Sequence, residues 1–276
     1  MVHFEISPIT EGVTRIDGVF HERMYLVEGS RRAALIDSGF GFGSLRKVVE
    51  SLTDKPVILL ITHGHVDHAM GAGEFPEAYM NPEDLPIFSR HGEKDFRWDG
   101  LLGDASLATE AEFVPTVSPS WFRPLAEGDV FDLGGITLEA WACPGHTPGS
   151  TVFLDRKNRL LFTGDAFSDY TLLLGPKTLT VEAYAESLRR LQSKIGGAFD
   201  RVLEAHGTGE LPPEVLPGVL QVCRDVMAGR SDRVPSKFRD LSGFLAKARK
   251  PHSLSRADGG IGNLVYREDK IWEGKL

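Results

Sequence analysis

The residues best suited to chemistry lie in one run of the sequence, Thr62-His-Gly-His-Val-Asp-His68, which holds three of the nine histidines. Three imidazoles and one carboxylate within six residues form a set of nitrogen and oxygen donors that suits zinc, iron or manganese. The alternative is a solvated polar loop, but clustered histidines without a metal repel one another when they are protonated. The run therefore predicts a metal site.

Three more candidate ligands follow, each beside a glycine. They are His146 in Cys143-Pro-Gly-His, Asp165 in Phe162-Thr-Gly-Asp, and His206 in Glu204-Ala-His-Gly. Glycine permits tight turns and close backbone approach, as loops that converge on a small ion require. Each residue alone would fit a capped turn or a buried, hydrogen-bonded histidine. Together with the first run they indicate further ligands of the same site.

A buried strand must position the first run. The unbroken apolar stretch Val57–Thr62 predicts a strand covered on both faces, which ends where the histidines begin. His63 and His65 are two residues apart, so their side chains can point the same way at the end of an extended strand. The chain must then turn, which lets Asp67 and His68 face the same space from the start of the next element.

The other predicted elements are short strands and amphipathic helices that alternate without an internal repeat. Helices are expected over 44–52 behind the cap Ser44, over Val181–Ile195 behind the cap Thr180, and from Pro212 or Pro213 to about Gly229. Strands are expected at Val13–Asp17, Met24–Glu28, Ala33–Asp37, Glu77–Met80, Thr137–Ala142, Thr151–Asp155, Arg159–Thr163 and Arg201–Glu204. This order is typical of the α/β or α+β class.

Length and charge exclude further classes of function. The 276 residues carry a formal charge of −8, which disfavours nucleic acid as a partner, and 41% of them are hydrophobic, as in globular proteins. No apolar stretch is long enough to span a bilayer and the opening residues lack signal-peptide features, so we expect a cytoplasmic protein without a membrane partner. Cys143 and Cys223 are too few for a disulfide framework and are expected to be small buried fillers.

The signature His-x-His-x-Asp-His at His63–His68, with Asp37 in Leu35-Ile-Asp-Ser-Gly before it and His146, Asp165 and His206 after it, resembles the metallo-β-lactamase superfamily. The resemblance covers most of the chain. It implies one α+β domain over residues 1–276, a four-layer αββα sandwich of two mixed β-sheets flanked by helices, with the site at one edge. Asp37 would orient a ligand, although an aspartate in a plain turn at a strand end is the alternative.

The resemblance also implies a dinuclear metal-dependent hydrolase. His63, His65 and His146 would hold one divalent ion, Asp67, His68 and His206 the second, and Asp165 would bridge both. Zinc is the first expectation, with iron or manganese as alternatives. A metal-bound hydroxide would attack the carbonyl of an ester, lactone or thioester, and Asp67 or Asp165 would relay its proton.

Some branches of the superfamily fit this chain better than others. The oxygen-reducing flavoproteins usually have Glu at the position of His65 and therefore fit this sequence poorly. The glyoxalase II-like thioesterases and the lactonases fit it better. The basic cluster with which glyoxalase II holds glutathione is not recognisable in Gly262–Arg267. Tyr170 could donate a hydrogen bond to substrate, as a tyrosine does in lactonases, or could be a packed aromatic.

Two segments break the regular pattern. Residues 83–122 read as a loop-rich insertion with six large aromatics, so Phe96 and Trp98 are expected either to line a substrate pocket or to form a satellite core. Residues 230–250 hold seven basic and two acidic side chains, which could bind phosphates or form a solvated helix surface.

A phosphodiesterase or nuclease with the same two metals is therefore the alternative function, and a non-enzymatic scaffold is a third possibility. Residues 83–112 hold eight acidic and three basic side chains, which would repel a polyanion. We therefore expect a small acyl substrate, with nucleic acid disfavoured and the oligomeric state left open.

Overall fold

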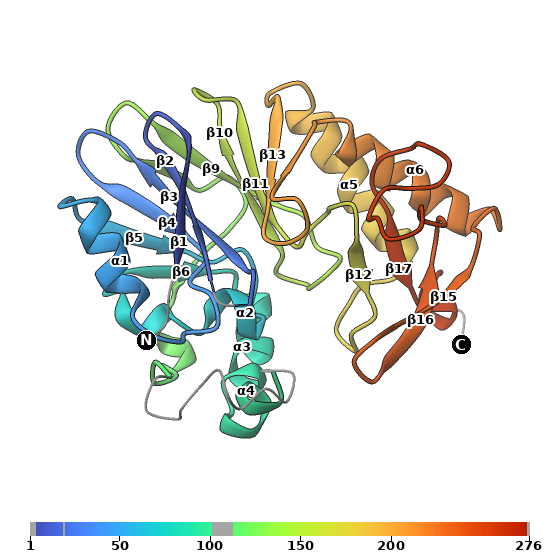
Figure 1. Ribbon diagram of the computed structural model, residues 1–276, viewed down its shortest axis with the longest axis horizontal. Helices are drawn as coiled ribbons and strands as arrows, with labels where there is room; N and C mark the ends of the chain where they lie inside the picture. Colours follow the sequence, from blue (N-terminus) through green and yellow to red (C-terminus); the bar gives the residue numbers. More distant parts are fainter. Residues whose placement is uncertain (1–3, 19, 101–112, 275–276) are drawn as a thin grey trace. The chain divides into compact units, whose positions relative to one another are not determined.

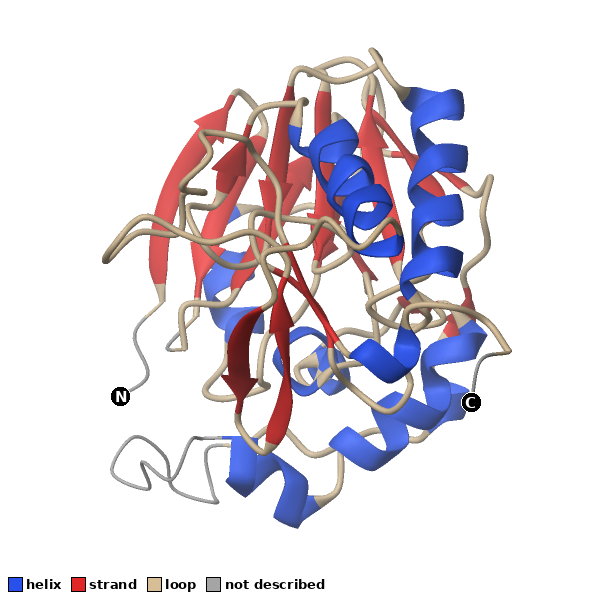
Figure 2. Cartoon of the chain, turned by 90° about the vertical axis from the view of Figure 1, so that its right-hand side faces the viewer, coloured by secondary structure: helices blue, strands red, loops and turns tan. Residues whose placement is uncertain are grey.

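The computed structural model describes residues 4–18, 20–100 and 113–274. The chain forms two compact units, Met1–Ala140 (unit 1) and Trp141–Leu276 (unit 2), which Figure 1 colours from blue to green and from green to red. Strands and helices are both abundant, as Figure 2 shows in red and blue. Within the described residues, no helix is long and apolar enough to cross a membrane.

Unit 1 is built on one mixed sheet with the strand order β1-β2-β3-β4-β5-β6-β7. The pairs from β1 to β4 are antiparallel and those from β4 to β7 are parallel. Residues of β4 and β5 are buried on both faces, as their continuous apolar sequences predict. The strands are β1 (Glu5–Thr10), β2 (Val13–Asp17), β3 (Arg23–Glu28), β4 (Ala33–Ile36), β5 (Val57–Leu60), β6 (Ala78–Met80) and β7 (Arg123–Pro124).

The helices of unit 1 follow from local sequence signals. Helix α1 (Leu45–Leu52) begins after Ser44, whose Oγ accepts a hydrogen bond from the Lys47 N–H. Helices α2, α3 and α4 follow one another in Figure 1. These helices are α2 (Val66–Ala69), α3 (Leu85–His91) and α4 (Lys94–Gly100). An antiparallel pair follows, β8 (Val130–Asp132) and β9 (Thr137–Ala142). Three 3₁₀ turns lie at Ala72–Glu74, Pro82–Asp84 and Pro119–Trp121.

Unit 2 contains two groups of paired strands, both with parallel and antiparallel neighbours. The first group is β10 (Thr151–Asp155), β11 (Leu160–Gly164), β13 (Arg201–Glu204) and β14 (Glu210–Leu211). The second is β12 (Thr171–Leu173), β17 (Leu264–Tyr266), β16 (Leu241–Leu245) and β15 (Val234–Phe238). Helices α5 (Val181–Ile195) and α6 (Val215–Met227) lie side by side, and a 3₁₀ turn covers Glu268–Lys270.

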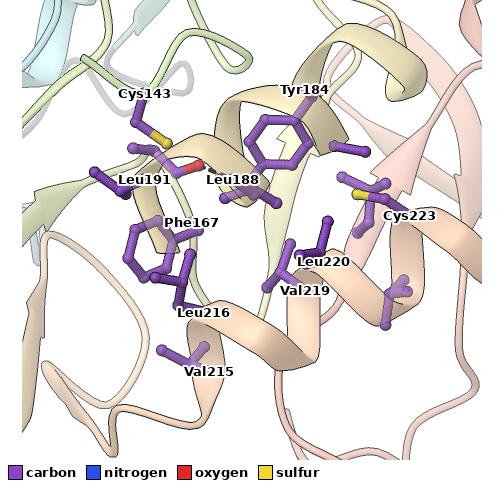
Figure 3. Close-up of a cluster of buried hydrophobic side chains, with 14 of the residues drawn as sticks. Cys143, Phe167, Tyr184, Leu188, Leu191, Val215, Leu216, Val219, Leu220 and Cys223 are labelled. Atoms are coloured by element: carbon purple, nitrogen blue, oxygen red, sulfur yellow. Dashed lines mark hydrogen bonds between the residues drawn. The ribbon is translucent and has the colours of Figure 1, made fainter. Parts of the chain in front are cut away.

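The core of unit 2 gathers the apolar faces of α5 and α6 (Figure 3). Tyr184 lies in this core and its hydroxyl donates to the carbonyl of Ala166 at 2.6 Å, so the one polar group of the ring has a partner. Cys143 and Cys223 are free, buried thiols in the same cluster, which confirms that they are fillers. Burial raises the pKa of the Cys143 thiol to about 12 and that of Cys223 further.

Most predicted elements are confirmed, and the two irregular segments differ from expectation. The helix surface expected for residues 230–250 is wrong, because this segment forms the β15–β16 hairpin. The insertion 83–122 is less irregular than expected, since it contains α3 and α4; its central part, 101–112, lies outside the described residues. Strands β1, β7, β8, β12, β14 and β17 carry no sequence prediction.

Candidate metal centre

The signature run of unit 1 forms the turn between β5 and α2. Strand β5 ends at Leu60, His65 is the residue before α2, and Asp67 and His68 lie within that helix. The expected order of strand, turn and helix is therefore present. His63 and His68 are each 1% exposed, so the two imidazoles are held inside the protein.

One buried carboxylate organises this turn. Asp37 follows β4, and its Oδ1 accepts the Thr62 backbone N–H at 2.7 Å while its Oδ2 lies 2.8 Å from Nδ1 of His68. A carboxylate accepts, so Nδ1 of His68 carries the hydrogen and Nε2 keeps its lone pair. The Thr62 hydroxyl donates to Asp37 at 2.8 Å and therefore accepts from Nδ1 of His63 at 3.1 Å. Asp37 thus sets the tautomers of both His63 and His68.

The donor atoms of unit 1 are spaced like ligands of an ion. Nε2 of His63 lies 3.1 Å from Nδ1 of His65, and Nε2 of His68 lies 3.7 Å from Oδ2 of Asp67. Two donors at 2.0–2.1 Å from a tetrahedral zinc ion would be roughly 3.3 Å apart. The donor set and its spacing therefore fit a divalent metal.

Unit 2 brings its three predicted ligands together in the same manner. Nδ1 of His146 donates to the backbone carbonyl of Leu172 at 2.8 Å, which leaves the lone pair on Nε2. Asp165 follows β11 and lies between two imidazoles: its Oδ2 is 3.5 Å from Nε2 of His146, and its Oδ1 is 3.6 Å from Nε2 of His206. Both distances exceed an ordinary hydrogen bond but fit ligands that share an ion.

Glycines make the loops of unit 2 possible, as their sequence positions predict. A Cβ atom on Gly145 would lie 2.0 Å from the ring of Tyr184, so a side chain there requires the ring to move. Gly207 has a φ of +65°, a conformation that costs other residues energy, and a Cβ there would meet the Glu204 carboxylate at 2.5 Å. The chain can therefore turn tightly beside His146 and His206.

The predicted substrate residues all have protein partners. The Tyr170 hydroxyl lies 3.3 Å from Oγ of Ser236, and the guanidinium of Arg249 stacks 3.9 Å from the centre of the Tyr170 ring. Phe96 stacks on a histidine, and Trp98 meets Phe113 edge to face at 5.3 Å between ring centres. Phe96 and Trp98 pack against the core of unit 1. Their roles in substrate binding stay predictions.

Three residues of unit 1 near the signature run have no signal in a sequence motif. The Asp84 carboxylate accepts the Gly64 N–H, and a ring nitrogen of His91 accepts the Val66 N–H. Glu22 is 3% exposed, and burial, with a smaller contribution from the charge of a nearby aspartate, raises its pKa to about 7. Only the scarcity of histidine could have drawn attention to His91.

The comparisons with known proteins agree with this geometry. The sequence model described as the Metallo-beta-lactamase superfamily matches residues 17–206, which is more than half of the chain. An acyl-coenzyme A thioesterase MBLAC2 from Gallus gallus is 29% identical in a 227-residue alignment, and the match covers 74% of this chain and 80% of that protein. The hydroxyacylglutathione hydrolase GloC from Haemophilus influenzae is 27% identical over 165 residues, or 59% of this chain and 71% of that protein.

Solved structures show the same fold. A metallo-β-lactamase from Pontibacter korlensis aligns with a TM-score of 0.59 at 19% identity and covers 81% of this chain and all of that one. The superfamily protein ST1585 from Sulfolobus tokodaii aligns with a TM-score of 0.53 at 21% identity over 80% of this chain and 85% of that one. The expected α+β sandwich with mixed sheets and flanking helices is confirmed. The chain belongs to the metallo-β-lactamase superfamily of hydrolases.

Proposed function

We propose that this hydrolase uses two divalent metal ions, with zinc expected, to cleave a small acyl substrate, and that a thioester is its substrate class. In keeping with membership of the superfamily, all seven candidate ligands would serve one dinuclear centre. One ion would take His63, His65 and His146, the other Asp67, His68 and His206, with Asp165 between them. The observation that carries the proposal is the fixed tautomers, because His63, His68 and His146 all keep the Nε2 lone pair that a metal needs.

The residues of the chain would divide the work. Divalent metal, when bound, lowers the pKa of water and stabilises negative charge on a carbonyl oxygen. Asp37 and the Leu172 carbonyl hold the hydrogens at Nδ1 of His68 and His146, so these rings keep one orientation during turnover. The carboxylate of Asp67 or Asp165 would accept the proton that the attacking water loses.

The relatives favour a thioester among the acyl compounds. Their names describe an acyl-coenzyme A thioesterase and a hydroxyacylglutathione hydrolase, and both of these substrates are thioesters. The net charge of −8 also disfavours a long polyanion such as nucleic acid. The partner we propose is therefore a small acyl compound, and nucleic acid stays disfavoured.

The basic segment 230–250 gives little support to the phosphodiesterase alternative. Three of its seven basic side chains already pair with acidic groups: Arg230 and Lys247 with Asp225, and Arg233 with Glu268. These pairs reduce the positive charge that the segment 230–250 could offer to phosphates.

An activity panel tests the proposal. Metal-free protein is reconstituted with zinc, iron or manganese, and kcat/KM is measured for acyl thioesters, lactones, β-lactams and bis(nitrophenyl) phosphate at fixed metal loading. We expect thioesters to give the highest kcat/KM and elemental analysis to give up to two ions per chain. A clear preference for the phosphodiester that weakens steeply with salt would favour the alternative, and binding of less than one ion per chain would overturn the metal assignment.

A further inference from the structure

Helix α3 lies within the insertion 83–122, yet both of its ends contact the signature turn of unit 1. Asp84 stands immediately before the helix and His91 is its last residue. Each places a hydrogen-bond acceptor against a backbone N–H of the turn. The two amides belong to Gly64 and Val66, the neighbours of His65 on either side.

The Asp84 end makes a close backbone contact. Asp84 is 0% exposed, and its Oδ2 accepts the Gly64 N–H at 2.8 Å. A Cβ atom on residue 64 would lie 2.6 Å from the carbonyl oxygen of Asp84 and 3.1 Å from the nitrogen of Phe88. The glycine of the signature run therefore lets α3 approach the chain between His63 and His65.

The His91 end holds both the backbone and a ring. Nδ1 of His91 lies 3.1 Å from the Val66 nitrogen, and since an N–H only donates, the His91 hydrogen is on Nε2. The His91 ring stacks on the ring of His65, with centres 4.8 Å apart and an interplanar angle of 10°. Phe96 stacks in turn on His91 at 4.0 Å and 23°.

We propose that Asp84 and His91 form a clamp that positions His65 as a metal ligand, an inference that rests on the proposed function. The clamp fixes the backbone on both sides of His65 and restricts the rotation of its ring. The His65 side chain does not cap α2, although the His65 carbonyl accepts the N–H groups of His68 and Ala69. A ligand that is already oriented loses less conformational freedom when the ion binds, so the clamp raises metal affinity. The insertion 83–122 thus influences metal affinity through the position of His65 in the turn.

Three variants of His91 separate its two contacts. His91→Ala removes both the acceptor and the stacked ring, His91→Phe keeps a ring only, and His91→Asn keeps an acceptor only. Ser89→Ala is the matched control, because Ser89 is an exposed residue of the same helix whose hydroxyl donates to the Leu85 carbonyl. The zinc Kd is measured by competition with a chromogenic chelator, and the cobalt-substituted protein gives an absorption spectrum that reports ligand geometry.

We expect His91→Ala to weaken zinc binding about 10- to 100-fold and to change the cobalt spectrum. His91→Phe and His91→Asn should each recover part of the affinity, and Ser89→Ala should match the wild type. Asp84→Ala should weaken binding in the same way, whereas Asp84→Asn, whose amide oxygen can still accept from Gly64, should bind better than Asp84→Ala. Urea unfolding of the metal-free variants identifies any loss of affinity that merely follows a loss of folding.

Two results would overturn the inference and are distinguishable. If the wild type binds zinc tightly while every folded His91 and Asp84 variant keeps its Kd and its cobalt spectrum, the clamp is wrong and the proposed function stands. If the wild type itself binds less than one ion per chain, the proposed function fails and the clamp fails with it.

Discussion

The two sets of candidate ligands are held in different ways. Unit 1 supplies four candidate ligands from the six residues His63–His68, and side chains orient them: Asp37 contacts His68 directly and reaches His63 through Thr62. These orienting groups are buried side chains that a single substitution can remove.

Unit 2 supplies its ligands from three separate loops, and the backbone does most of the orienting. The partner of His146 is the carbonyl of Leu172, which no substitution deletes. The loops depend instead on glycines such as Gly145 and Gly207. The comparison teaches that the ligands of unit 1 should be sensitive to changes in neighbouring side chains, and those of unit 2 to changes that add a side chain where none fits.

The largest expected effect is at the one ligand of unit 2 that faces two imidazoles. Asp165→Ala should lower kcat/KM by at least about 10³-fold, because removal of even one transition-state donor typically costs 10²- to 10³-fold. Tyr170→Phe is the control and should cost less than about tenfold, since it removes one hydroxyl whose partner here is Ser236. Equal, small losses in the two variants would contradict a ligand role for Asp165.

A buried acid of unit 1 gives the next largest effect, on stability. Burial raises the pKa of Glu22 from 4.5 to about 7, with a smaller contribution from the charge of Asp67. The folded state therefore holds the proton of the Glu22 carboxyl more tightly than the unfolded state does. The contribution of this proton to the free energy of unfolding is complete below pH 4.5 and is lost as the pH rises through 7. A shift of this size corresponds to about 3 kcal/mol.

The check is urea unfolding of metal-free protein between pH 4.5 and pH 8. The free energy of unfolding of the wild type should fall across this range, and Glu22→Gln should remove that part of the decline and be the more stable protein at pH 8. Parallel curves for the two proteins would show that Glu22 is not the titrating group.

An added methyl group tests the glycine dependence of unit 2. Gly145→Ala would place a Cβ atom 2.0 Å from the Tyr184 ring, so the core must shift and we expect a loss of about 1–3 kcal/mol in the free energy of unfolding. Gly197→Ala separates this clash from backbone strain, because Gly197 has open space around it but a positive φ. If Gly145→Ala keeps wild-type stability, the close packing of this loop on α5 is wrong.

Removal of the Asp37 carboxylate tests whether buried side chains orient the candidate ligands of unit 1. Asp37→Asn should weaken zinc binding about 10- to 100-fold, because an amide cannot accept from the Thr62 amide, the Thr62 hydroxyl and His68 as a carboxylate does. Thr62→Val should weaken zinc binding less than Asp37→Asn does, because it disturbs the tautomer of His63 alone. A Kd unchanged in both variants would remove the distinction between the two ligand sets.

Sequence reasoning worked where the determinants are local. The bounds of α5 and the start of α1 follow from apolar periodicity and from the capping residues Thr180 and Ser44. The turn of the signature run follows from a buried strand that gives way to polar donors. In these places, neighbouring residues alone decide the backbone.

It failed where tertiary contacts decide. The β15–β16 hairpin is mostly exposed, and Pro235, Ser236 and Lys237 interrupt the apolar residues of β15. It therefore has neither the apolar run nor the clean alternation that indicates a strand. Three-residue strands such as β12 and β17 exist only through their pairing, β12 with β17 and β17 also with β16. Asp84 and His91 belong to no motif, because their role arises from the approach of α3 to a turn about 20 residues earlier.

The two buried thiols have a practical consequence for assays. A thioesterase is conveniently followed by a reagent that reacts with the released thiol, and such reagents attack thiolates. Cys143 and Cys223 are buried and their pKa values are raised, so the folded protein should contribute no background to that signal. Unfolding exposes both, and the same reagent then counts two thiols per chain. One colour reaction can thus report turnover while the protein is native and the loss of its structure when it is not.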